Sequence, residues 1–219
     1  MPKATATSER SDMARIVDCG VLRRSRGTTR CVFDGMAAAS DMIGTLSHKE
    51  DVLGFTKGQF SLADLLAAIL DQTGPAECKV CTWTAADSDL RSCFALLHHG
   101  HLTGLRFVFD YGIESCRDYM DAIVEEFGWE SFRVTRTHAK FAIVRNAEWS
   151  IAIRSSMNFN WNPRFEFFEI SDNAEVCGFL ENVFDQAFER GARLGASISE
   201  ARSLFIDFDL GGGAKPDGW

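Results

Sequence analysis

The side chains best suited to chemistry stand two residues apart, at His138 and Lys140, inside an apolar run. Alternate residues of a strand point to the same side, so a strand spanning 132–144 would carry both on one face. Neutral imidazole is a nucleophile near pH 7, and the ammonium group is a compact positive charge. The pair therefore suits attack on a negatively charged centre.

A second polar series follows a strand expected over 149–154. Ser156, Asn158 and Asn160 recur at alternate positions, so this strand would deliver them to one face as well. Hydroxyl and amide groups donate hydrogen bonds to developing negative charge. Together the two series hold what phosphodiester cleavage needs: a nucleophile, a counter-charge and donors to the non-bridging oxygens.

At these residues the chain resembles the phospholipase D superfamily, whose half-site reads His-x-Lys, four residues, Asp, and then Gly-Ser-x-Asn. Four residues match this pattern: His138, Lys140, Ser156 and Asn158. Ser155 stands where glycine is usual, and Arg145 stands where the aspartate is expected. Glu166 resembles the acidic residue that follows the asparagine in this family, with Glu169 as the alternative.

The resemblance implies a reaction without a metal or cofactor, carried out by two half-sites together. One histidine attacks phosphorus to give a phosphohistidine, and the other protonates the leaving oxygen. Lys140 and Asn158 would hold charge on the phosphoryl oxygens, Ser156 would add a donor, and Glu166 would orient His138. Because the sequence shows one half-site and no internal repeat, the resemblance implies a homodimer with the two histidines facing each other.

Single-half-site members of this superfamily are often bacterial or phage nucleases, so we expect a metal-independent phosphodiesterase that acts on nucleic acid. The alternative is a non-enzymatic nucleic-acid-binding module whose degenerate site grips phosphate, and phosphatidyl transfer ranks third. No apolar stretch approaches eighteen residues, and no apolar leader follows Met1, so neither a membrane partner nor secretion is expected. A cytoplasmic location follows by default.

The net charge of −8 argues against broad electrostatic attraction to nucleic acid. Residues 1–49 nevertheless carry eight Lys or Arg against five Asp or Glu, and they contain the densest basic cluster of the chain. That cluster is a solvated loop or a phosphate-contacting arm. The residues expected to bind substrate, besides the half-site itself, are Asn160, Arg23, Arg24 and Arg26.

Seven cysteines, an odd number, indicate reduced thiols rather than a disulfide framework. Cys78 and Cys81 suggest a metal site, but on a strand over 78–84 they would face opposite sides. We therefore expect no zinc there. The cluster His98-His99-Gly100-His101 is typical of a helix carboxyl end, where glycine ends the helix and histidine meets the last carbonyls.

The sequence predicts a partly disordered, locally basic arm over 1–49, a phospholipase D-like domain over 50–210 and a flexible tail over 211–219. Expected strands span 52–55, 78–84, 105–109, 132–144, 149–154 and 165–171. Expected helices span 61–72, 87–98, 113–126 and 174–194, the first opened by a capping box at Ser61. This alternation predicts an α/β layered sandwich with a mixed, largely parallel sheet flanked by helices.

Overall fold

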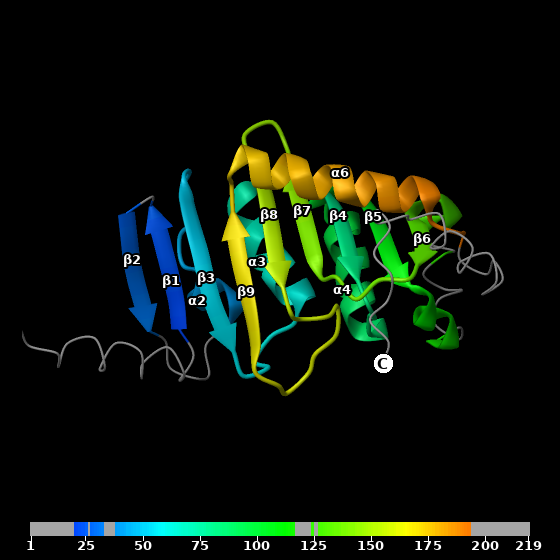
Figure 1. Cartoon of the computed structure of the whole chain (residues 1–219), viewed down its shortest axis with the longest axis horizontal. Coiled ribbons are helices and arrows are strands. Elements are labelled where there is room, and N and C mark those ends of the chain that lie inside the picture. The colour runs from blue at the N-terminus through cyan, green and yellow to red at the C-terminus, as the bar shows by residue number, and fades with distance from the viewer. Residues whose placement is uncertain (1–19, 26, 33–37, 117–123, 125–126, 194–219) are drawn as a thin grey trace, which may run out of the picture.

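The computed structural model describes residues 20–25, 27–32, 38–116, 124 and 127–193. Over these residues one nine-stranded sheet crosses the molecule in the order β2-β1-β3-β9-β8-β7-β4-β5-β6 (Figure 1). Its strands are β1 (Gly20–Ser25), β2 (Gly27–Val32), β3 (Glu50–Thr56), β4 (Ala76–Thr82), β5 (Leu102–Asp110), β6 (Phe132–Thr135), β7 (Phe141–Arg145), β8 (Ser150–Ser155) and β9 (Glu166–Ser171).

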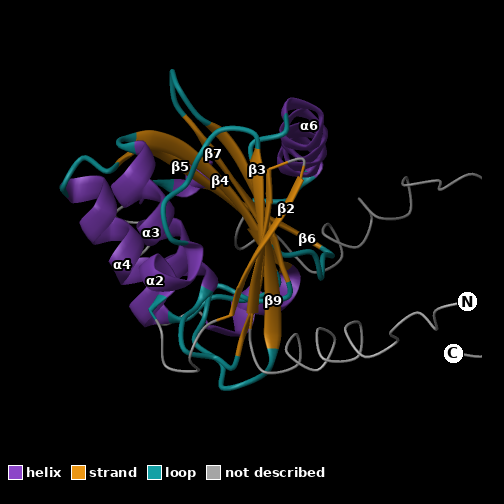
Figure 2. Cartoon of the chain, turned by 90° about the vertical axis from the view of Figure 1, so that its left-hand side faces the viewer, coloured by secondary structure: helices purple, strands orange, loops and turns teal. Residues whose placement is uncertain are grey.

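Helices cover both faces of the sheet. Figure 2, which views the sheet along its edge, shows α2 (Ala39–Ile43), α3 (Leu62–Thr73) and α4 (Asp87–His98) on one side and α6 (Ala174–Arg190) on the other. A large apolar cluster lies under α2, α3 and α4, and a smaller one around Phe184 lies under α6. The predicted α/β layered fold with a mixed sheet is confirmed.

The prediction of mainly parallel pairing is corrected. Among the described strands, β4 with β5 and β5 with β6 pair in parallel. The other six pairs are antiparallel. Helices separate β3, β4 and β5 along the chain, but β7, β8 and β9 follow one another through loops alone. Such direct connections favour antiparallel neighbours, because a parallel return needs a long crossover.

Strand directions bring several loops to one edge of the sheet. The pairings make β3, β4, β5, β6 and β8 run one way, and β7 and β9 the opposite way. The carboxyl ends of the first group and the amino ends of the second therefore share an edge, which is the lower one in Figure 1. We call it the site edge. α3 and α4 also begin there.

The helix ends follow the sequence signals. Ser61 Oγ accepts hydrogen bonds from the backbone N–H groups of Ala63 and Asp64, and the Asp64 carboxylate accepts one from Ser61 N at 2.8 Å. This is the predicted capping box. α4 ends at His98, and His99 Nδ1 lies 2.7 Å from the carbonyl oxygen of Ala95. The predicted histidine-rich carboxyl end is confirmed.

The single strand predicted over 132–144 is wrong. β6 ends at Thr135 and pairs with β5, whereas β7 begins at Phe141 and pairs with β4, so residues 136–140 connect two separated strands. The Thr137 hydroxyl accepts a hydrogen bond from Ala139 N at 3.1 Å, which turns the backbone away from an extended ladder. His138 and Lys140 thus lie on a loop at the site edge.

Two other expectations concern the ends of the domain. β1 joins the sheet by antiparallel pairing with β3, so part of the expected arm is a strand. The domain boundary at residue 49 stays a prediction. Of the helix expected over 113–126, residues 113–116 belong to a 3₁₀ turn, η1 (Tyr111–Cys116), and most of the remainder lies outside the described residues. Residues 1–19 and 194–219, with the expected disordered start and tail, lie outside them too.

Gly58 holds the loop after β3 against the loop after β8. Its φ is +87°, and a Cβ atom there would lie 2.2 Å from the carbonyl oxygen of Asn162. Gly58→Ala should cost about 1–2 kcal/mol for the left-handed backbone and about 1–3 kcal/mol more for the overlap. Gly100→Ala, at φ +75° with open space around it, should cost the first amount alone. Urea unfolding measures both, and equal losses would contradict the packing role of Gly58.

Candidate active site

His138 and Lys140 lie side by side on the loop between β6 and β7. Lys140 Nζ is 3.0 Å from His138 Nδ1 and 3.2 Å from Nε2, and it donates to the His138 carbonyl oxygen at 2.8 Å. His138 is exposed and Lys140 is half-buried. An ammonium group can only donate, so any hydrogen bond between the two side chains has a ring nitrogen of His138 as its acceptor. The loop therefore presents an imidazole next to a positive charge.

Asp110, at the end of β5, fixes this loop. It is 8% exposed, and its carboxylate accepts hydrogen bonds from Gly112 N at 2.9 Å and from Thr137 N at 3.0 Å. Both bonds are charge-assisted and shielded from water, which makes them stronger than ordinary backbone bonds. No motif in the sequence includes Asp110, although an aspartate at the end of an apolar strand is at a position where functional residues are often found.

Cys81 lies under the same loop. Its thiol donates to the Ala139 carbonyl oxygen at 3.9 Å and lies 3.7 Å from Thr137 Oγ1. Burial raises the pKa of Cys81 to about 11, so the thiol is uncharged at neutral pH. Cys78 packs in the cluster under α2, α3 and α4, whereas Cys81 belongs to the cluster under α6. The prediction that they face opposite sides is confirmed.

Ser156 and Glu166 meet where β8 ends and β9 begins. The Ser156 hydroxyl donates to Glu166 Oε2, and Ser156 Oγ accepts from Phe167 N at 3.0 Å. The sequence predicted that Glu166 orients His138, but its hydrogen-bond partner in the structure is Ser156. Glu169, the alternative acid, lies 2.5 Å from Arg154 Nη2 in an ion pair. Of the two carboxylates, Glu166 is therefore the one in contact with Ser156, and its role in a site stays a prediction.

Burial and the Glu166 carboxylate act in opposite directions on the pKa of Lys140. Desolvation lowers the pKa of the Lys140 ammonium below its usual value, while Glu166 and Cys81 act in the opposite sense. The electrostatic attraction between Lys140 and Glu166 connects the loop before β7 with the start of β9. His138, Lys140, Ser156 and Glu166 are thus gathered at the site edge from the loop before β7, the end of β8 and the start of β9. Their arrangement offers a nucleophile, a positive charge, a hydroxyl donor and a carboxylate.

Asn158 and Asn160 follow Ser156 in the connection after β8. The alternation that the sequence predicted holds, because Met157 and Phe159 are buried in the core and the residues between them are half-buried. The side-chain oxygens of both asparagines are buried, and neither has a hydrogen-bond partner among the described residues. Buried amide groups without partners are uncommon and are candidates for ligand contacts. Their assignment to phosphate stays a prediction.

Arg145 lies at the other end of β7, away from the site edge. It forms an ion pair with Glu181 of α6, with Nη2 and Oε2 2.6 Å apart. The sequence predicted that Arg145 points away from His138 and Lys140, and the structure agrees. The backbones of Arg23 and Arg24 lie on β1, opposite Val52 and Asp51 near the start of β3, so the structure does not bring them to the site edge.

Arg26 lies outside the described residues, and a substrate contact by the basic cluster stays a prediction.

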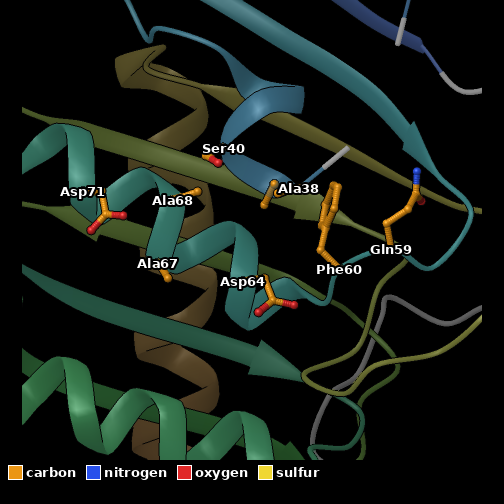
Figure 3. A pocket seen from close by; sticks show the side chains of 9 residues that line it. Ala38, Ser40, Gln59, Phe60, Asp64, Ala67, Ala68 and Asp71 are labelled. Atoms are coloured by element: carbon orange, nitrogen blue, oxygen red, sulfur yellow. The ribbon is translucent and has the colours of Figure 1, made fainter. Parts of the chain in front are cut away.

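A separate hollow of about 340 Å³ lies between α2, α3 and the loop before α3 (Figure 3). Asp64, Asp71 and Ser40 line it, and none of the half-site residues does. Among the described residues, no helix is long and apolar enough to cross a membrane.

No protein-family model matches this chain, and no curated protein matches it. Solved structures do resemble it. NucT from Helicobacter pylori is 14% identical, with a TM-score of 0.46 over 66% of this chain and 97% of that one. The phospholipase D family member Nuc from Salmonella typhimurium is also 14% identical, with a TM-score of 0.45 over 65% and 96%.

Polyphosphate kinase from Porphyromonas gingivalis is 15% identical, with a TM-score of 0.45 over 62% of this chain, which spans only 26% of that enzyme. A phospholipase D family member is therefore among the structural neighbours. The likeness concerns the course of the backbone, and the residues at the site edge carry the functional argument that follows.

Asp110→Asn should loosen the loop that carries His138. The amide keeps one acceptor but turns an NH₂ group toward a backbone donor, so one of the hydrogen bonds to Gly112 N and Thr137 N is lost. Losing a hydrogen bond to a charged group costs about 1.5–3 kcal/mol, so we expect the Thr137 amide to exchange its hydrogen about 10- to 100-fold faster. Hydrogen–deuterium exchange followed by NMR measures this, and Asp71→Asn, an exposed change on α3, is the control. An unchanged exchange rate at Thr137 would contradict the positioning role of Asp110.

Glu166→Gln should lower the pKa of Lys140 further. The carboxylate favours the charged ammonium, so its removal makes the proton leave at a lower pH. NMR titration of ¹⁵N-lysine-labelled protein measures this, with Lys140→Arg identifying the signal. Glu169→Gln is the control, because that carboxylate pairs with Arg154. A rise in the pKa, or equal shifts in both variants, would contradict the interaction.

Proposed function

We propose that this chain is a metal-independent phosphodiesterase of phospholipase D type that cleaves nucleic acid. The observation that carries the proposal is the meeting of His138 and Lys140 with Ser156 and Glu166 at one edge of the sheet. A phosphodiester is an anion whose cleavage needs a nucleophile and stabilisation of the oxygens around phosphorus. Lys140 supplies the positive charge that a metal ion supplies in other phosphodiesterases.

The reaction takes two displacements. A ring nitrogen of His138 attacks phosphorus, and the bond to the leaving oxygen breaks as that oxygen takes a proton from a second imidazolium. Water then gives a proton to this second imidazole and attacks the phosphohistidine, which releases His138 and a phosphate monoester. Lys140 holds the non-bridging oxygens in both steps, and Ser156 does so once its single hydroxyl proton turns from Glu166 to the phosphate. Phosphate entry also draws Lys140 away from the imidazole, which leaves the ring nitrogen free to attack.

The second imidazole must come from a second copy of the chain. The sequence contains five histidines. His48 precedes β3, and His98, His99 and His101 precede β5, so all four lie at the edge opposite His138. A single chain therefore lacks a general acid of this kind beside its nucleophile. A two-fold axis at the site edge would bring two copies of His138 together, since such an axis joins identical surfaces.

One observation favours a second candidate, a nucleic-acid-binding module that grips phosphate without cleaving it. The Glu166 carboxylate accepts its hydrogen bond from Ser156, so nothing in its contacts orients His138 for attack. Lys140, Ser156 and the asparagines would still bind a phosphate group. Nicking of a plasmid in EDTA separates the two candidates, because the binding module leaves the plasmid intact.

His138→Ala and Lys140→Ala should each abolish plasmid nicking, and Glu166→Gln should do the same. The loss of one group that stabilises charge typically costs about 10²–10³-fold in rate, and loss of the nucleophile costs more. Nicking by the parent protein should persist in EDTA. His101→Ala, remote from the site edge, should keep full activity. Activity that EDTA removes and magnesium restores would contradict the histidine mechanism.

A mixing experiment tests the dimer. Wild-type chains are co-refolded with excess His138→Ala chains. The activity per wild-type chain should fall in proportion to the share of His138→Ala chains in the mixture, because every mixed dimer lacks one histidine. Light scattering should report a dimer throughout. Co-refolding His138→Ala with Lys140→Ala should not restore cleavage. A monomer that cleaves, or a constant activity per wild-type chain, would contradict the shared site.

A further inference from the structure

Trp83 is an exposed aromatic side chain beside the half-site. It follows β4 directly and is 44% exposed, and the centroid of its ring lies 5.4 Å from that of His138 with an angle of 48° between the planes. Lys140 Nζ lies 6.0 Å from the centre of the same ring. A large apolar side chain left in water beside the reactive groups of the site is available for a ligand.

The backbone around Trp83 is held firmly. Thr82 is fully buried, and its hydroxyl donates to the Thr84 carbonyl oxygen at 3.0 Å. Phe159, which is fully buried after β8, donates its N–H to Thr84 O at 3.2 Å and accepts from Ala86 N at 2.8 Å. These bonds on both sides leave the indole on a fixed support. A fixed aromatic ring loses little entropy when it stacks on a ligand.

The neighbours of the ring favour a particular ligand. An indole offers an electron-rich face to which cations and flat aromatic rings bind. His138 and Lys140 would hold a phosphate group, and in a nucleotide chain a base is tied to each phosphate through its sugar. A phosphate at His138 therefore brings an adjacent base within reach of Trp83. An acyl chain would gain nothing from the aromatic character of the ring.

We propose that Trp83 stacks on the base next to the bound phosphate and so selects unpaired nucleic acid strands. The proposal deepens the proposed function, because it rests on phosphate binding at His138 and Lys140. Bases in a duplex already stack on both faces and must leave the helix before a side chain can cover them. An unpaired strand meets the ring without that cost. Stacking on one aromatic side chain also tolerates any base sequence.

The test is a binding measurement that does not require cleavage. All proteins carry His138→Asn, and fluorescence anisotropy in EDTA follows a labelled single-stranded oligonucleotide and the same sequence as a duplex. Trp83→Leu should raise the Kd for the single strand about 5- to 100-fold, the usual range for one stacked base. It should leave the Kd for the duplex within twofold. Trp83→Phe should keep most of the affinity, because it keeps an aromatic ring.

Trp129 provides the matched control. It is 50% exposed and begins η2 (Trp129–Ser131) before β6, at the edge opposite the site edge, so Trp129→Leu should change neither Kd. Thermal unfolding of each variant checks that the fold is kept. Equal losses for single strand and duplex, or a Trp83→Leu protein that binds like its parent, would overturn the proposal. An absence of single-strand binding would overturn it too. So would a Trp83→Leu protein that binds phosphatidylglycerol vesicles more weakly than its parent but binds the oligonucleotides as well as its parent does.

The same variants with His138 intact separate this proposal from the proposed function. If the protein cleaves, Trp83→Leu should raise KM for single strands by the same factor and leave kcat unchanged. The parent protein could show no cleavage while Trp83→Leu still weakens single-strand binding selectively. In that case the phosphodiesterase assignment fails and the stacking assignment stands. Loss of kcat without a change in KM would place Trp83 in support of the loop instead, and would overturn the stacking role.

Discussion

The antiparallel ladder of β7, β8 and β9 is the constraint on which the site depends. Ser155 N donates to Lys140 O at 3.0 Å, and Ser156 N donates to Phe167 O at 3.1 Å, so the ladder ends at residues of the proposed site. Because side chains alternate along a strand, a shift of one residue would turn Ser156 away from Glu166. The packing that fixes this register therefore also fixes the distances between the polar groups of the site.

The departure from the superfamily pattern at Arg145 has its explanation on the other side of the sheet. Lys79, which is 8% exposed, lies 2.8 Å from both Glu181 and Asp185 of α6, and Arg145 shares Glu181 with it. Such pairing is what makes a nearly buried ammonium tolerable. An aspartate at position 145 would repel Glu181. The arginine thus belongs to the attachment of α6, at the far end of β7 from the half-site.

The sequence predicts local features of this molecule well and long-range ones poorly. The capping box at Ser61 and the end of α4 at His98 follow from residues within one helical turn, and both are found. The break before Phe141 depends on Asp110, which is 27 residues from Thr137 along the chain. Strand direction also depends on distant partners, so a largely parallel sheet was expected and a mainly antiparallel one is found. The spacing of the polar residues predicts four members of the half-site. Trp83 belongs to no motif, and only the fold shows that it lies beside His138.

In the proposed mechanism, cleavage passes through a covalent bond between His138 and phosphorus. The stereochemical course of cleavage at a chiral phosphorothioate linkage in ¹⁸O-labelled water distinguishes this route from direct attack by water. Each displacement at phosphorus inverts the configuration, so two successive displacements restore it. We expect net retention, and net inversion would rule out the phosphohistidine, because a single attack by water does not form it.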